Sequence, residues 1–184
     1  MTMTAAPVIL VGDSDIARWP PDLWPEGTIE CRGRNGWTLR EVVEGLIRED
    51  DEDAILVVCA GENDIGSLPL SDTQQAFRDL CTMNLFHVLF LGPKFEPWLA
   101  DDTDSRKAYV LLSQMMGREA TPPVQFIDCL LMFCGDSAHQ PGALLGGRGR
   151  AESRFFDPDQ LHLSREGYEI WKTCIEEHVQ RLGE

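Results

Sequence analysis

The sequence contains no long apolar run. None of its 184 residues belongs to a stretch of about 18 or more apolar residues, so we expect no segment that spans a membrane. Only the seven residues from Met1 to Pro7 precede the first apolar run, which leaves no room for the charged, apolar and cleavage regions of a signal peptide. We therefore expect a cytoplasmic protein.

Basic residues are also scarce. The chain has 16 Lys and Arg against 31 Asp and Glu, which gives a formal net charge of −15 and a pI near 4.5. Such a surface repels nucleic acid and anionic membranes, so neither is an expected partner. The acidic runs at 48–53 and 101–104 lack the alternating ligands and the glycine of a calcium loop, and we interpret them as solvated loops or helix ends.

Closely spaced cysteine pairs are absent. The six cysteines are scattered without C-x-x-C spacing, so the sequence predicts no zinc site. Most of them lie inside apolar runs, which is typical of reduced core thiols in a cytoplasmic protein. They are Cys31, Cys59, Cys81, Cys129, Cys134 and Cys174.

The length and the 43% hydrophobic content indicate one α/β domain over residues 1–184. Short apolar runs that end at a turn predict buried strands. These runs are 8–11, 54–60, 87–91 and 124–129, with 28–32 as a weaker edge candidate. Helical patterns separate them at 39–49, 71–83 and 105–117, and a last helix, capped by Ser164, carries an apolar stripe. This alternation predicts a parallel sheet with helices on both faces.

A serine stands just after the first predicted strand. In parallel sheets, ligands bind outside the carboxyl ends of the strands, and a hydroxyl on a sharp turn there is well placed for nucleophilic attack. Ser14, in the tripeptide Gly12-Asp13-Ser14, has this position. It also suits a simple helix N-cap, and the tripeptide alone leaves both interpretations open.

His162 is the one histidine of four whose surroundings suit catalysis. Asp159 lies three residues earlier, so its carboxylate can accept the Nδ1 hydrogen and leave Nε2 free to face a hydroxyl. An incidental surface histidine is the alternative. Asn63, after the strand 54–60, can donate to an oxyanion together with a glycine and the Ser14 N–H, although Asn63 also suits an ordinary turn.

Four sequence blocks together resemble the SGNH, or GDSL-like, hydrolase family. The blocks are Gly12-Asp-Ser14, Arg34-Asn-Gly-Trp37, Gly61-Glu-Asn-Asp64 and Asp159-Gln-Leu-His162. They occur in the family's order, and the resemblance covers residues 8 to 171. It implies a flavodoxin-like three-layer α/β/α sandwich with a five-stranded parallel sheet of order 2-1-3-4-5. It also implies an ester hydrolase without a metal or another cofactor.

The resemblance implies a role for each matching residue. Ser14 corresponds to the nucleophile, His162 to the base and Asp159 to the partner of the base. The oxyanion hole corresponds to the Ser14 N–H, the Gly36 N–H and the Asn63 side chain. Gly36 is preferred to Gly33 because the segment 35–38 occupies the place of the family's Ser-Gly-Asp-Thr.

The chain departs from the usual family pattern at three residues. Asp15 stands where Leu is usual, Trp37 where Asp is frequent, and Glu62 where Thr is common. We expect these side chains at the rim of the site, where they bear on the choice of substrate. The long segment 133–157 is either a loop over the site or a flexible linker.

The leading hypothesis is a serine esterase that acts on a short-chain carboxylic ester, as acetylesterases do, with a small-molecule ester as its partner. A lysophospholipase or thioesterase-type hydrolase and an inactive SGNH-fold binding module are alternatives. A nucleotide-binding flavodoxin-like protein is disfavoured, because the carboxylates of Asp13 and Asp15 would repel the phosphate.

Overall fold

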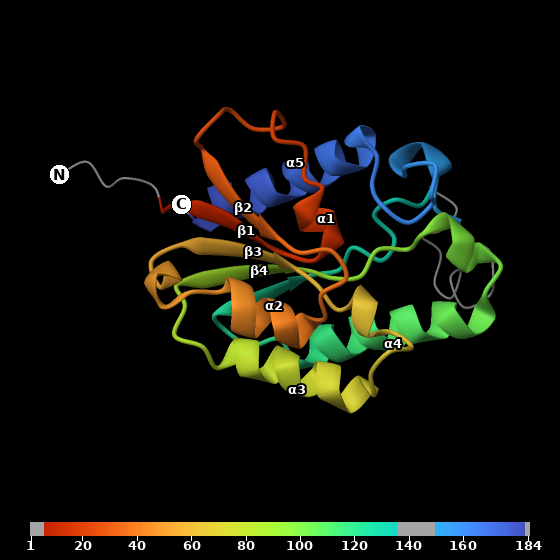
Figure 1. Cartoon of the computed structure of the whole chain (residues 1–184), viewed down its shortest axis with the longest axis horizontal. Coiled ribbons are helices and arrows are strands. Elements are labelled where there is room, and N and C mark those ends of the chain that lie inside the picture. The colour runs from red at the N-terminus through yellow and green to blue at the C-terminus, as the bar shows by residue number, and fades with distance from the viewer. Residues whose placement is uncertain (1–5, 136–149, 183–184) are drawn as a thin grey trace.

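A five-stranded parallel sheet forms the centre of the molecule (Figure 1). The structure, a computed structural model, describes residues 6–135 and 150–182. The strands are β1 (Val8–Gly12), β2 (Ile29–Gly33), β3 (Ile55–Cys59), β4 (His87–Leu91) and β5 (Val124–Ile127). Their order in the sheet is β2-β1-β3-β4-β5, and every neighbouring pair is parallel. The predicted α/β class, parallel sheet and strand order are therefore confirmed.

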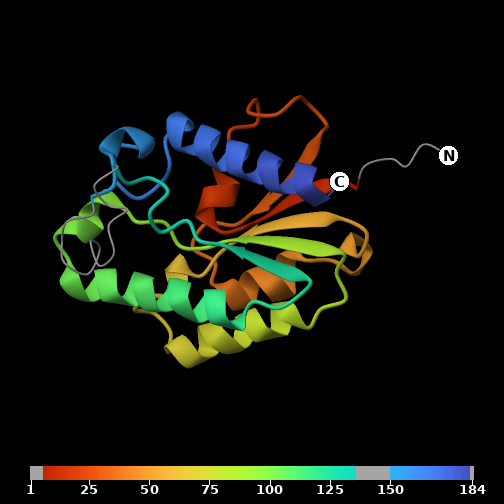
Figure 2. The ribbon, with the colours of Figure 1, turned by 180° about the vertical axis from the view of Figure 1, so that it is seen from behind.

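Helices cover both faces of the sheet. The helices are α1 (Ser14–Ala17), α2 (Leu39–Leu46), α3 (Leu70–Cys81), α4 (Thr103–Glu119) and α5 (Arg165–Leu182). Short 3-10 turns occur at η1 (Glu49–Asp51), η2 (Glu62–Asp64), η3 (Pro97–Ala100) and η5 (Ser153–Phe155). Helices α1 and α5 lie over one face and α2, α3 and α4 over the other, as Figures 1 and 2 show from opposite sides.

The central strands are mainly apolar because helices cover both faces of the sheet and bury nearly all side chains of these strands. Every residue of β3 is buried, and successive side chains point to opposite faces. Val57 and Leu89 belong to the core beneath α1 and α5, whereas Val58 and Phe90 belong to the core against the other helices. Tyr168, Trp171 and Ile175 of the apolar stripe of α5 lie in the first of these cores, whereas Leu182 at the end of the stripe is exposed.

Helix α2 ends earlier than the pattern at 39–49 predicts. It begins at a capping box in which Thr38 and Glu41 satisfy each other's backbone N–H groups, but it ends at Leu46. The reason is Asp51, whose Oδ2 accepts hydrogen bonds from Arg48 N at 2.8 Å and from Arg32 Nη1 at 2.6 Å. These bonds stabilise the separate turn η1 in place of further helix.

Two further expectations need qualification. Four of the six cysteines are buried free thiols, but Cys31 is exposed because β2 is an edge strand and its face there is open to solvent. The expected loop or linker at 133–157 is described only at its ends, since residues 136–149 lie outside the described residues. No helix in the described part of the chain has the length and apolar character needed to cross a bilayer.

Candidate active site

The turn that carries Ser14 is held rigidly at the carboxyl end of β1. Asp13 N donates to Cys59 O at 3.1 Å, and Asp13 Oδ1 accepts from Asp15 N at 3.1 Å, which caps α1 at Ser14. Gly12 is required by the close approach of β3, because a Cβ atom there would lie 2.2 Å from Cys59 O. The hydroxyl of Tyr168 in α5 donates to Asp15 O at 2.7 Å, so α5 also holds this turn in place.

The structure joins His162 to Asp159. Asp159 Oδ2 lies 2.7 Å from His162 Nδ1, and Asp159 Oδ1 accepts from His162 N at 3.0 Å. The intervening Gln160 has a φ of 58°, which allows the turn to be this tight. The hydrogen bond from the imidazole holds the pKa of Asp159 well below its ordinary value. Because the carboxylate accepts from Nδ1, Nε2 is the ring nitrogen left for another partner.

The Asp159–His162 turn lies beside the helix that begins with Ser14. Arg18, at the C-terminal cap of α1, has Nη1 3.7 Å from Asp159 Oδ2, and Arg18 N donates to Ser14 O at 3.0 Å. The structure does not form the expected hydrogen bond between Ser14 Oγ and His162 Nε2, and neither atom has a hydrogen-bond partner among the described residues. Bonds of this kind often tighten only when substrate binds.

Asn63 connects three of the four sequence blocks. Its Nδ2 donates to Asp13 Oδ2 at 3.2 Å and to Trp37 O at 3.0 Å. The carbonyl of Trp37 can only accept, so the nitrogen of the Asn63 amide must face it. Both amide hydrogens are therefore engaged, and an oxyanion would have to share or replace one of these bonds.

The two candidate glycines differ in their surroundings. Gly33 lies tightly against α1, where a Cβ atom would be 2.0 Å from Ala17 N, so its role is close packing. Gly36 has a φ of +75° in the open turn between Arg34 and Trp37, and a Cβ atom added there would have no atom within 4 Å. The N–H of Gly36 has no acceptor among the described residues. Gly36 as an oxyanion donor remains a prediction.

Sequence reasoning missed a buried lysine at this edge of the sheet. Lys94, in the loop after β4, has Nζ 2.7 Å from Asp15 Oδ2, 2.7 Å from Glu62 Oε2 and 3.0 Å from Glu96 Oε1. Asp15 and Glu62 were expected to face the substrate at the rim, but Asp15 is 2% exposed and both carboxylates bind Lys94 instead. The sequence shows only that Lys94 follows a central strand, and this position does not indicate its burial or its distant partners.

Carboxylates accumulate around this lysine and raise one another's pKa. Burial, followed by the charge of Asp15, raises the pKa of Asp13 to about 7. Burial also raises the pKa of Glu62 well above its ordinary value, although Lys94 acts in the opposite direction. A pKa of about 7 means that Asp13 keeps its proton, next to Ser14, at pH values where a free carboxyl group is ionised.

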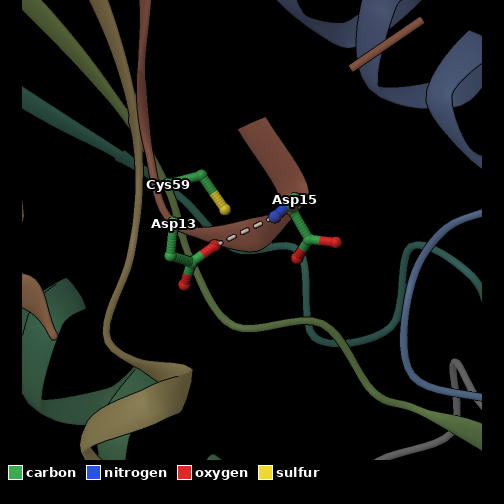
Figure 3. Close-up of side chains that lie close together, drawn as sticks. All are labelled: Asp13, Asp15 and Cys59. Atoms are coloured by element: carbon green, nitrogen blue, oxygen red, sulfur yellow. Dashed lines mark hydrogen bonds between the residues drawn. The ribbon is translucent and has the colours of Figure 1, made fainter. Parts of the chain in front are cut away.

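Asp13, Asp15 and Cys59 lie close enough together to be considered as metal ligands. Their ligand atoms lie within 4.8 Å of one another at the start of α1 (Figure 3). However, Asp13 and Asp15 accept hydrogen bonds from Asp15 N, Asn63 Nδ2 and Lys94 Nζ, and only Asp15 Oδ1 has no donor among the described residues. Burial raises the pKa of the Cys59 thiol, so it keeps its proton. We assign no metal to these residues.

Comparison with known proteins supports the fold. The sequence matches no protein-family model and no curated protein. A solved structure from Streptococcus pneumoniae, whose description refers to a platelet activating factor, matches with a TM-score of 0.74 at 18% identity, over 97% of this chain and 86% of that one. The likeness is one of fold.

Two further solved structures have the same fold. The acetylxylan esterase Axe2 from Geobacillus stearothermophilus matches with a TM-score of 0.65 at 13% identity, over 96% of each chain. The OSK domain of Drosophila Oskar matches with a TM-score of 0.68 at 16% identity, over 91% of this chain and 86% of that one. This chain therefore has a fold that an esterase also adopts.

Proposed function

We propose that this chain is a serine esterase of the SGNH type that hydrolyses a short-chain carboxylic ester through an acyl-Ser14 intermediate. The observation that carries the proposal is the 2.7 Å contact between Asp159 and His162, on a turn that Arg18 joins to the helix of Ser14. Asn63, bound to Asp13 beside Ser14, supports an oxyanion hole at the same edge of the sheet.

In the acylation step, His162 Nε2 takes the proton of Ser14 Oγ while that oxygen attacks the ester carbonyl carbon. Asp159 keeps the other ring nitrogen protonated and stabilises the imidazolium that forms. The Ser14 N–H, the Gly36 N–H and the Asn63 amide donate to the oxyanion. The carbon–oxygen bond to the alcohol then breaks, and His162 gives the proton to the departing oxygen. Water, deprotonated by His162, releases the acid and restores Ser14.

The reaction requires two local adjustments of the structure. Ser14 Oγ and His162 Nε2 must come within hydrogen-bond distance of each other, and Asn63 must turn one amide hydrogen from Asp13 or Trp37 toward the substrate. Release from Asp13 is easier when that carboxyl group is protonated, because a neutral acceptor binds an N–H more weakly than a charged one. The pKa of about 7 for Asp13 is consistent with this adjustment.

Activity on p-nitrophenyl esters of increasing chain length tests the proposal. We expect turnover of the acetyl ester to exceed that of long-chain esters, in keeping with the acetylxylan esterase among the fold neighbours. Ser14→Ala should lose about 10³-fold or more of the activity, and only the unaltered chain should react with a fluorophosphonate probe. Hydrolysis no faster than that of Ser14→Ala, without labelling, would refute the esterase.

One observation favours a second candidate, an inactive SGNH-fold binding module. Both hydrogens of the Asn63 amide are engaged, and Ser14 and His162 form no hydrogen bond with each other in the described part of the chain. A binding module would retain this arrangement with a ligand present. It predicts thermal stabilisation by non-hydrolysable esters, with no burst of p-nitrophenol and no probe adduct on Ser14.

A further inference from the structure

A buried lysine contacts both the turn that carries Ser14 and the turn that carries Asn63. Lys94 belongs to the loop 92–96 after β4, every residue of which is buried, and Lys94 itself is 1% exposed. Two of its partners, Asp15 and Glu62, lie next in sequence to Ser14 and Asn63, respectively. One ammonium group thus contacts both turns.

The contact with Glu62 fixes both oxygens of its carboxylate. Lys94 N donates to Glu62 Oε1 at 2.7 Å, and Lys94 Nζ donates to Glu62 Oε2 at 2.7 Å. Since two bonds from one residue define both the place and the rotation of a carboxylate, the backbone of η2 at Glu62 is held against the β4 loop. Asn63 is the next residue of that same turn.

Lys94 is itself anchored from the side of α4. Its third partner, Glu96, is fully buried and accepts hydrogen bonds from Trp98 Nε1 at 2.6 Å and from Tyr109 Oη at 3.2 Å. A movement of the ammonium would leave buried carboxylates without a cation, which is strongly unfavourable. The network therefore has little freedom to shift.

We propose that Lys94 is a positioning residue that ties the Ser14 turn to the Asn63 turn through Asp15 and Glu62 and so sets the geometry of the oxyanion hole. This inference rests on the proposed function. It also explains why Asp15 and Glu62 depart together from the usual GDSL-like pattern: each binds the same buried lysine. Neither Lys94 nor its carboxylate partners touch the substrate in this role.

The substitution Glu62→Gln tests the link between Lys94 and the Asn63 turn, because Gln has nearly the same size and shape as Glu. The amide keeps one acceptor oxygen, but its NH2 group cannot accept from Lys94, so one of the two bonds is lost. We expect kcat to fall by about 10- to 100-fold with KM changed by less than about twofold, because misplacement of an oxyanion donor acts on the transition state. Lys94→Met should have a larger effect, but this variant also risks misfolding because it leaves the carboxylates unpaired.

Asp51→Asn is the matched control. Asp51 is a buried carboxylate that binds Arg32 at 2.6 Å, and it contacts no residue of the proposed site. Its substitution should lower the melting temperature while the folded protein keeps its kcat. A merely structural role for Glu62 would give this same result, and unchanged kcat in Glu62→Gln would overturn the proposal.

A second measurement does not depend on activity. The side-chain amide signal of Asn63 is recorded by ¹⁵N NMR and assigned by its loss in Asn63→Asp. We expect Glu62→Gln to shift or broaden this signal and Asp51→Asn to leave it in place. An unchanged signal in Glu62→Gln would overturn the positioning role, whereas absence of hydrolysis by the unaltered chain would refute the esterase alone.

Discussion

Asn63 donates a hydrogen bond to Asp13 at 3.2 Å and one to Trp37 O at 3.0 Å, and so binds the turns that follow β1, β2 and β3 to one another. The residue therefore combines a structural role with its proposed catalytic one. Because Asn63 links these loops and is also proposed to donate to the oxyanion, its substitution should lower both stability and turnover.

Asn63→Ala should lower kcat by about 10²- to 10³-fold with little change in KM, because the oxyanion loses a donor that acts in the transition state. The melting temperature should also fall, because a buried acceptor of Asp13 is left unsatisfied. Kinetics and thermal unfolding on one preparation measure both effects. Asn84→Ala, in the exposed segment before β4, is the control and should change neither. A destabilised Asn63→Ala with normal kcat would remove Asn63 from the mechanism.

Asp159→Asn should reduce kcat by at least about 100-fold. The amide cannot hold the imidazole in the tautomer that leaves Nε2 as a base, and it cannot stabilise the imidazolium. Asp157→Asn is the comparison, since Asp157 contributes its backbone N–H to His162 O at 2.8 Å, and in the described part of the chain its side chain forms no hydrogen bond or ion pair with the ring. Equal losses in the two variants, measured as kcat on the same ester, would reject Asp159 as the partner of His162.

The contribution of Asp13 to the free energy of unfolding should fall as the pH rises from about 4 to about 7. Burial raises the pKa of Asp13 from its ordinary 3.8 to about 7, with the charges of Asp15 and Asp64 acting in the same direction and Lys94 in the other. In this window the unfolded chain has released the proton while the folded chain still holds it, so higher pH favours unfolding.

Urea denaturation of the unaltered chain and of Asp13→Asn at about pH 5 and about pH 7 measures this contribution. The variant carries no titrating group at this position, so its stability relative to the unaltered chain should increase over the interval. If the difference in free energy of unfolding between the two proteins is the same at both pH values, Asp13 keeps its ordinary pKa in the folded protein.

The amino-acid sequence alone determined the elements of the fold and their alternation. Apolar runs such as Ile55–Cys59 predict buried strands, because a strand covered on both faces needs an apolar residue at every position. The Asp159–His162 contact was also predictable, because three residues of separation on a tight turn leave the two side chains few other arrangements. Each of these features depends on residues that are near in the chain.

The tertiary structure alone decided the contacts between distant residues. Lys94 is 79 residues from Asp15 and 32 from Glu62, so nothing in their local patterns indicates that they form one buried network. The early end of α2 likewise depends on Asp51 meeting Arg32 of the edge strand. Burial removes water as a competing partner, and a buried charge must then find its counter-charge wherever the fold brings one. For this reason Asp15 and Glu62, which were expected at the rim of the site, bind Lys94 instead.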